Sequence, residues 1–203
     1  MDKRRLYYLK AFGFEYLEEV KRNKGANISF EELQNSVRKC TLCNFSKLRK
    51  KSLIEKEMKK AKVLIFQTYI DKYENESGEF FASKLKQDFL LKFKELLDLS
   101  EDEIYFSYVL KCFSNFKFDK NSVEFCLPYF YSELEFIKPK IILCLGEEAF
   151  LSLGFENFKV YVGQWLRFNE SLIMPNYDLD YLSKNPSLYA NFIEDIKKIK
   201  GYL

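Results

Sequence analysis

Hydrophobic side chains recur along this chain at two spacings, and the switches between them predict alternating strands and helices. Short apolar runs with β-branched or aromatic residues predict strands at 62–66, 103–110, 140–145 and 171–174. The polar stretches at 67–82 and from 174 to about 185 are expected to be loops. The strands are short and mainly apolar, which is typical of a sheet that is covered on both faces.

Helical spacing of apolar residues fills the segments between these runs. It predicts helices over residues 1–25, 83–98 and 121–137, a helix from about 147, and a closing helix that ends near 200. Ser29 and Glu32 match a capping box, which begins a further short helix. Asn121 or Ser122 is the expected cap of the helix at 121–137.

This order of elements predicts an α/β fold, because strands that alternate with helices form right-handed βαβ units. We expect a three-layer αβα sandwich with a central, mainly parallel four-stranded sheet. The predicted domain covers residues 36–203, and residues 1–35 form an N-terminal helical extension. Ligands of such sheets bind at the carboxyl ends of the strands. Those ends are residues 67–82, 108–118, 146–148 and 174–182.

Composition narrows the chemistry of this domain. Hydrophobic residues make up 47% of the 203 residues, so a sizeable core can form. The chain has no histidine, which removes the commonest general base near neutral pH and the commonest metal ligand. No apolar run of about 18 residues predicts a membrane span, and no signal peptide is visible. We therefore expect a cytoplasmic protein, and we expect a monomer.

Positive charge is concentrated in one window. The chain has a net charge of +3, whereas residues 47–62 hold eight basic and two acidic residues, a net charge of +6. Such a run is either a solvated face or a surface that binds phosphates. The second interpretation predicts contacts to a DNA backbone by Arg49, Lys50, Lys51, Lys59 and Lys60.

Four cysteines carry the strongest chemical signal. Cys40 and Cys43 form a Cys-x-x-Cys pair, Cys112 follows after sixty-eight further residues, and Cys126 after another thirteen. Plain burial, a redox pair and structural zinc all compete as explanations. One close pair with two remote single thiols also suits a four-cysteine iron–sulfur cluster that joins distant segments. From spacing alone the cluster, zinc and burial stay open.

Several short motifs stand in a fixed order along residues 36–200. They are Cys40-x-x-Cys43-x-Phe45-x-x-x-Arg49, Lys111-Cys112, Cys126-x-Pro128, Pro139-Lys140-Ile141-Ile142-x-x-Leu145-Gly146-x-x-Ala149, Gly163-x-Trp165 and Asn185-Pro186. In this order and with this cysteine spacing, the chain resembles the iron–sulfur (family 4) uracil-DNA glycosylases. The resemblance implies DNA as a partner and a [4Fe–4S] cluster on the four cysteines, with zinc as the alternative. It leaves Cys144, inside a predicted strand, as a packing residue.

The same resemblance implies a base pocket and a catalytic site, and here the sequence departs from the family. Gly78-Glu79-Phe80-Phe81 matches Gly-x-Pro-Phe, so Phe81 would stack on a flipped base. However, Thr68 stands where the family has a glutamate, Tyr108 where it has an asparagine, and Asp178 where it has a histidine. A carboxylate at Asp178 has the wrong sign to stabilise a departing uracil anion.

Three functions remain. The first is a binding protein that keeps the cluster and DNA affinity but excises uracil weakly or not at all. The second is an active DNA glycosylase with a rebuilt site. The third is a scaffold whose N-terminal helix docks a protein partner. The catalytic positions are Thr68, Asp71 and Asp178, and the base pocket consists of Phe81, Tyr108 and Asn176. A rebuilt site would use Asp71, Asn75, Asp178 or Asn176.

Overall fold

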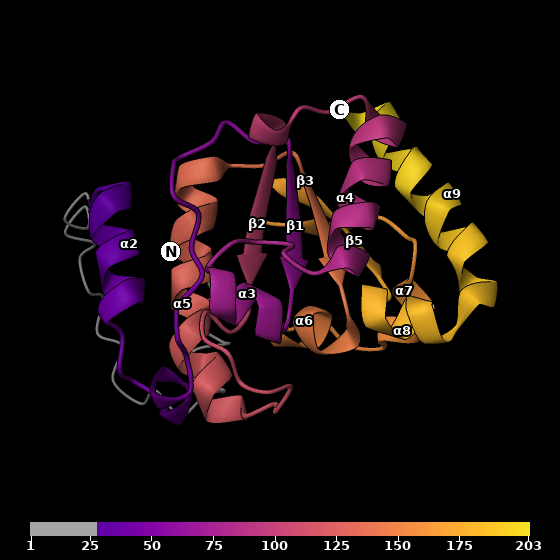
Figure 1. Ribbon diagram of the computed structural model, residues 1–203. Helices are drawn as coiled ribbons and strands as arrows, with labels where there is room; N and C mark the ends of the chain where they lie inside the picture. Colours follow the sequence, from indigo (N-terminus) through magenta and orange to yellow (C-terminus); the bar gives the residue numbers. More distant parts are fainter. Residues whose placement is uncertain (1–27) are drawn as a thin grey trace.

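The computed structural model describes residues 28–203, so the helix predicted over residues 1–25, with its proposed partner, lies outside the described residues. The described residues form a five-stranded sheet in the order β2-β1-β3-β5-β4, with helices on both faces (Figure 1). The strands are β1 (Val63–Gln67), β2 (Ile104–Tyr108), β3 (Ile141–Leu145), β4 (Leu166–Phe168) and β5 (Ser171–Asn176).

The four predicted strands are the parallel part of this sheet. β1 pairs with β2 and β3, and β3 pairs with β5, all in parallel. This confirms the three-layer α/β fold class. The fifth strand, β4, is antiparallel to β5 and was missed. It has only three residues, of which Phe168 alone is buried, so it has too little apolar pattern to be recognised.

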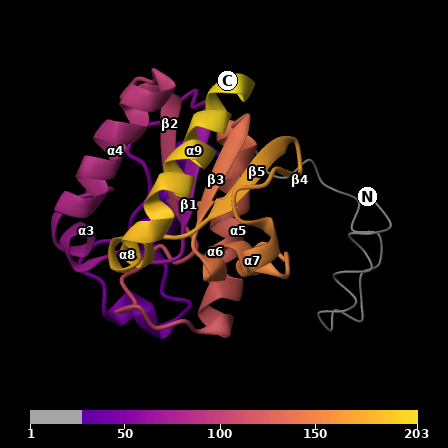
Figure 2. The same cartoon turned by 90° about the vertical axis from the view of Figure 1, so that its right-hand side faces the viewer.

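Alternation along the strands separates two cores. Leu64 and Phe66 of β1 belong to one apolar cluster, and Val63 and Ile65 belong to the other. The first cluster packs against α5, and the second packs against α4 and α9 (Figure 2). Burying both faces accounts for the uniformly apolar strands.

The helices follow the predicted order with four corrections, one of which is the four-residue helix α7 (Phe158–Tyr161), which was not predicted. Two predicted loops contain short helices, α3 and α8, which begin directly after Asp71 and Asp178 because those side chains cap the first turn. The cap of α5 is Asp119 rather than Asn121 or Ser122. The helices are α2 (Phe30–Lys39), α3 (Lys72–Ser77), α4 (Lys84–Leu97), α5 (Lys120–Ile137), α6 (Glu147–Ser152), α7 (Phe158–Tyr161), α8 (Leu179–Lys184) and α9 (Tyr189–Ile199). Short 3₁₀ turns are η1 (Asn44–Lys47), η2 (Glu101–Glu103), η3 (Pro186–Leu188) and η4 (Lys200–Tyr202).

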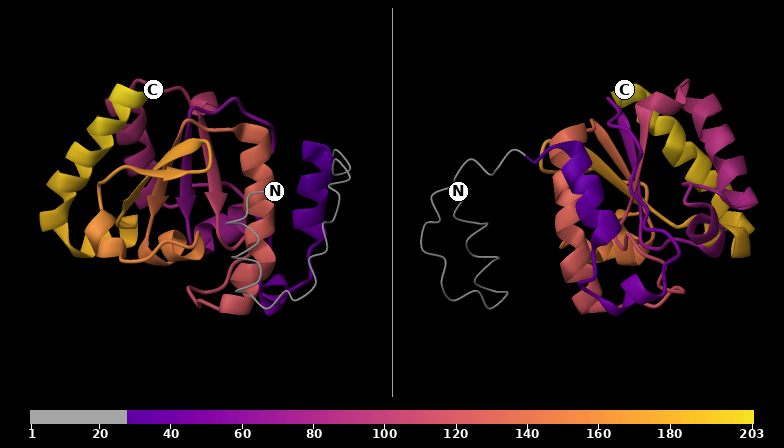
Figure 3. Two further views of the ribbon diagram at one scale, coloured as in Figure 1. Left: turned by 180° about the vertical axis from the view of Figure 1, so that it is seen from behind. Right: turned by 60° about the vertical axis from the view of Figure 1, so that its left-hand side comes forward.

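The N-terminal part of the described chain packs against α5. The predicted capping box of Ser29 and Glu32 is present, and it begins α2. Phe30 contacts Phe136 of α5 edge to face, with ring centroids 5.6 Å apart, and α2 lies outside α5 in the left view of Figure 3. The predicted domain boundary at residue 35 falls inside this helix. Within residues 28–203, no helix has the length and apolar character needed to cross a membrane.

Candidate functional site

A cavity of about 620 Å³ lies at the carboxyl ends of β1, β3 and β5. The strands point toward α3 and α6 at this edge of the sheet (Figure 1). Its wall consists of residues 67–69, 145–148 and 178–180, together with Leu85, Lys86, Phe116 and Lys184. Three loops that are far apart in the sequence therefore build one site, at the edge where ligands of parallel sheets bind.

Thr68 and Asp178 are the two predicted catalytic residues that line this cavity. They converge at Gly146, where a Cβ atom would lie 3.6 Å from Thr68 Oγ1 and 3.7 Å from Asp178 Oδ2. Gly146 has a φ of +104°, a conformation that favours glycine. The other oxygen of Asp178 accepts a hydrogen bond from the Tyr181 backbone nitrogen at 2.7 Å. Asp178 is therefore oriented by the helix that it caps.

The residues predicted to hold a base, Phe81 and Tyr108, lie in the core and do not line the cavity. Phe81 is 2% exposed, and its ring centroid is 4.6 Å from that of Phe106. Tyr108 is 1% exposed and donates its hydroxyl hydrogen bond to Glu74 at 2.5 Å. Burial and the Glu74 carboxylate raise the pKa of Tyr108 well above its ordinary value, so its hydroxyl stays protonated.

A buried ion-pair network fills the space beside these rings. Glu74 is fully buried and accepts a hydrogen bond from Lys86 at 2.7 Å, as well as from the backbone nitrogens of Asp71 and Phe81. Lys86 is 5% exposed and also lies 3.1 Å from Asp71 and 3.2 Å from the Tyr108 hydroxyl. Its ammonium is 5.7 Å from the Phe81 ring centre. A base could reach Phe81 only if this network moved.

Asn176, predicted for the base pocket, is bound to α9 instead. Its side-chain nitrogen donates to Asp195 at 2.9 Å, and its oxygen accepts from the Tyr177 backbone nitrogen. Asn75, the remaining polar candidate, accepts a hydrogen bond from the Lys50 backbone nitrogen at 2.8 Å. Neither amide lines the cavity.

Sequence reasoning missed Lys86, Glu74 and Gln67. Lys86 lies on the buried stripe of α4 with Phe89, Phe93 and Leu97. A lysine at that spacing signals a buried acidic partner, because an unpaired charge is too costly to bury. Which acid it meets depends on the loop conformation, so the sequence alone did not identify Glu74.

The cavity wall is rich in acidic groups. Glu147 and Glu148 follow β3, and Asp178 and Asp180 follow β5. Lys184 also lines the wall, whereas the charge of Lys86 is compensated by Glu74 and Asp71. Burial and a hydrogen bond with Glu148 raise the pKa of Tyr69, which also lines the cavity. The site is therefore negatively charged near neutral pH.

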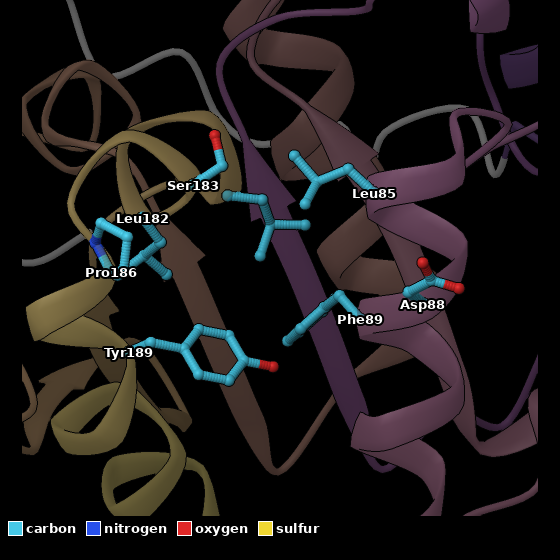
Figure 4. Close-up of a pocket in the computed structure, with 8 residues that line it drawn as sticks. Leu85, Asp88, Phe89, Leu182, Ser183, Pro186 and Tyr189 are labelled. Carbon is cyan, nitrogen blue, oxygen red and sulfur yellow. The ribbon is translucent and has the colours of Figure 1, made fainter.

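A smaller apolar cavity of about 330 Å³ lies between α4 and the α8–α9 region (Figure 4). Leu85 and Phe89 face Leu182, Pro186 and Tyr189 across it. It shares Leu85 and Leu179 with the larger cavity but contains none of the predicted site residues.

The four predicted metal ligands come from separate elements. Cys40 ends α2, Cys43 precedes η1, Cys112 follows β2, and Cys126 lies in α5. The neighbouring thiols contribute to the pKa shifts, since Cys43 and Cys40 raise the pKa of Cys112, and Cys112 and Cys43 raise that of Cys126. Burial raises the pKa of Cys126 to about 11, and it raises the pKa of Cys112 although Arg49 opposes this. All are free thiols, and among residues 28–203 no three potential ligands are grouped closely enough to hold a metal ion.

The predicted DNA-backbone residues divide into two groups. Arg49 is directed at the cysteines, where it donates to Cys112 Sγ at 3.1 Å, and Lys59 is mostly buried beside Glu55. Lys50, Lys51 and Lys60 are exposed. Lys50 pairs with Glu76 at the surface, which is a weak interaction in water.

A second buried network supports the cysteine region. Glu133 of α5 accepts hydrogen bonds from Lys111 at 2.5 Å, Ser107 at 2.6 Å and Tyr105 at 3.1 Å. Lys111 precedes Cys112, and α5 carries Cys126, so this network fixes the two elements that present the buried thiols.

The parallel sheet with a ligand cavity at its carboxyl edge defines an α/β protein of the doubly covered class. A family model described as the uracil DNA glycosylase superfamily matches residues 56–199, and the chain belongs to that superfamily. The family resemblance predicted from the motifs is thereby confirmed.

Curated relatives refine this assignment to family 4. The type-4 uracil-DNA glycosylase of Sulfurisphaera tokodaii is 26% identical over 186 residues, which cover 85% of this chain and 84% of the relative. That of Saccharolobus solfataricus is 24% identical over 183 residues, covering 84% and 85%. That of Pyrobaculum aerophilum is 26% identical over 187 residues, covering 86% and 94%.

Proposed function

We propose that this protein binds a [4Fe–4S] cluster and DNA, and that it excises uracil weakly or not at all. One observation carries the second half of this proposal: Phe81, on which a flipped base would stack, is 2% exposed, with the Phe106 ring centroid at 4.6 Å and the Lys86 ammonium at 5.7 Å from its own ring centre. Displacing the network of Lys86 and Glu74 would separate a buried ion pair, which costs about 3–5 kcal/mol.

The charge of the cavity also disfavours uracil. Hydrolysis of the glycosidic bond sends uracil away as an anion, which needs neutral or positive donors. Asp178 and Glu148 place carboxylates in the wall instead. At 4 Å and an effective dielectric constant of about 20, two like charges repel by about 4 kcal/mol. This is enough to cancel the benefit of several hydrogen-bond donors.

For the cluster, the proposed ligands are Cys40, Cys43, Cys112 and Cys126. The donor chemistry suits such a cluster, because all four are free thiols and Arg49 places a cation against Cys112 Sγ. Binding would have to draw the four sulfurs together, since no three potential ligands among residues 28–203 are grouped closely enough to hold a metal ion. When bound, the cluster would cross-link α2, the loop after β2 and α5. Zinc is the alternative occupant of the same thiols.

Metal analysis of anaerobically purified protein tests this assignment. We expect about four irons and four sulfides per chain. Cys112→Ala should lose the iron, whereas Cys144→Ala, in β3 and not among the proposed ligands, should keep it. Stoichiometric zinc in colourless protein would contradict the assignment.

DNA binding is proposed from the family names of the relatives and from the basic window. Phosphate contacts release counterions, so affinity should fall steeply with salt. Replacing Lys50, Lys51 and Lys60 with Gln should lower the slope of log affinity against log salt, by up to about 0.9 per lost contact on duplex DNA. Exposed Lys92, Lys138 and Lys197 provide a matched triple control. An unchanged slope in the first variant would argue against this surface.

The alternative is an active glycosylase with a rebuilt site. It is favoured by the convergence of Thr68 and Asp178 at Gly146 inside the cavity. Single-turnover excision on uracil-containing strands, with Asp178→Asn and Asp178→His beside the parent, separates the two proposals. Rapid release of uracil by the parent that Asp178→Asn abolishes would establish the rebuilt site.

A further inference from the structure

The larger cavity has an acidic wall, which suits a positively charged base better than a departing uracil anion. Resting on the proposed binding of DNA, we propose that it accepts an extruded nucleobase that carries a positive charge, such as a ring-N-methylated purine. Three independent features of the wall carry this inference: its carboxylates, an unpaired amide and two aromatic rings.

The carboxylates supply the charge selectivity. Glu147, Glu148, Asp178 and Asp180 line the wall, and Lys184 is the one lining cation not already bound to buried acids, among the described residues. Asp178 is oriented, because its Oδ1 caps α8 while Oδ2 lies near Gly146. A charge-assisted hydrogen bond from a cationic ligand to such a carboxylate is worth about 1.5–3 kcal/mol.

Gln67 supplies a hydrogen-bond donor that the protein itself does not use. It is 6% exposed and lines the cavity, and its side-chain nitrogen has no hydrogen-bond partner among the described residues. A buried polar group without a partner costs about 1–3 kcal/mol. A carbonyl or ring-nitrogen acceptor on a bound base would accept a hydrogen bond from Gln67 and so recover this cost. Attraction of a cation to the acidic wall alone would not recover it.

Two aromatic rings stand in the same wall. Phe116 is 53% exposed and contacts Tyr69 edge to face, with centroids 5.8 Å apart, and both line the cavity. Asn115 and Phe116 both have positive φ, of 54° and 57°, which is unusual for a phenylalanine. Aromatic faces attract cations, so the rings and the carboxylates favour the same class of ligand.

The departing-group chemistry agrees with this class. When the C1′–N bond of a methylated, cationic base breaks, the base keeps the bonding electron pair and leaves as a neutral molecule. Water adds to C1′ and releases one proton, so atoms and charge balance. The site then needs no hydrogen-bond donor to stabilise a leaving anion, so the absence of histidine from the chain does not prevent the reaction.

Equilibrium binding to single-stranded oligonucleotides tests the proposal, with one central N7-methylguanine, guanine or uracil in the same sequence. We expect the N7-methylguanine strand to bind at least 10-fold more tightly than the guanine strand. Asp178→Asn, which can still cap α8, and Gln67→Met should each reduce that preference about 10-fold. Asp102→Asn, exposed at the opposite end of β2, is the matched control and should leave it unchanged.

Comparing the three strands distinguishes failure of the cationic-base site from failure of DNA binding. Binding of all three strands with equal affinity would overturn the cationic-base site while leaving DNA binding intact. Failure to bind any strand would refute DNA binding. In that case, the affinities for 7-methylguanosine and guanosine, compared by equilibrium dialysis, test the cavity alone. Equal or absent binding of the two nucleosides would overturn the proposal there as well.

Discussion

Replacing Lys86 with methionine should destabilise the fold strongly, because it removes the cation from a buried network and keeps the carboxylates. Methionine preserves most of the side-chain volume, so the change is mainly electrostatic. Glu74 would remain fully buried with a carboxylate, supported by the Tyr108 hydroxyl and two backbone nitrogens. Asp71 would lose a partner at 3.1 Å.

The magnitude follows from these contacts. The hydrogen bond between Lys86 and Glu74 is charge-assisted, at 2.7 Å, and worth about 1.5–3 kcal/mol. The uncompensated buried charge raises the total loss to about 3–5 kcal/mol. Adding Glu74→Gln to Lys86→Met removes that charge, so the double variant should be more stable than Lys86→Met alone.

Urea unfolding under anaerobic conditions measures the effect. With a slope of about 2 kcal/mol/M, the midpoint of Lys86→Met should fall by about 1.5–2.5 M. Lys92→Met, on the exposed side of the same helix and paired with Glu95 at 3.1 Å, should lose less than about 1 kcal/mol. A loss for Lys86→Met as small as that for Lys92→Met would refute the reasoning.

Two further predictions concern other contacts. Glu133→Gln should lower the free energy of unfolding by about 3–5 kcal/mol, because Lys111 would keep a buried charge without its partner. Glu135→Gln on the same helix should change the free energy of unfolding little, and thermal unfolding compares the two variants. Glu103 has its pKa lowered to about 2 by its hydrogen bond with Lys62, so its contribution is complete above about pH 4.5 and is lost as the pH falls toward 2. Glu103→Gln should therefore flatten stability against pH in that window, and urea midpoints that keep the parent's pH slope there would contradict it.

Most of the fold could be predicted from the sequence because each parallel strand is buried on both faces. Runs such as 63–66 have no polar alternative, and the intervening helices have clear apolar stripes. β4 was missed because its pairing depends on β5 rather than on its own pattern. The helices α3 and α8 were missed because each has six residues, too few to establish a periodicity.

The site was harder to predict, because a motif gives a position in the chain and not the direction of a side chain. Thr68 and Asp178 reach the cavity through the ends of parallel strands, as the topology requires. Phe81 and Tyr108 stand at matching positions but are enclosed by Lys86 and Glu74, which come from other elements. Arg49, expected on the basic surface, is drawn to Cys112. These outcomes depend on contacts between distant segments.

We propose that the chain keeps cluster and DNA binding and has lost efficient uracil excision. The most direct measurement is single-turnover release of uracil from one labelled strand by iron-quantified protein, with binding to the same strand recorded in the same samples. The type-4 enzyme of Sulfurisphaera tokodaii serves as the positive control. We predict that the protein binds the strand but releases uracil at a rate at least about 10²-fold below that of the control. A factor of this size is the effect of losing one electrostatic donor. Uracil release at a rate comparable to the control would contradict the account.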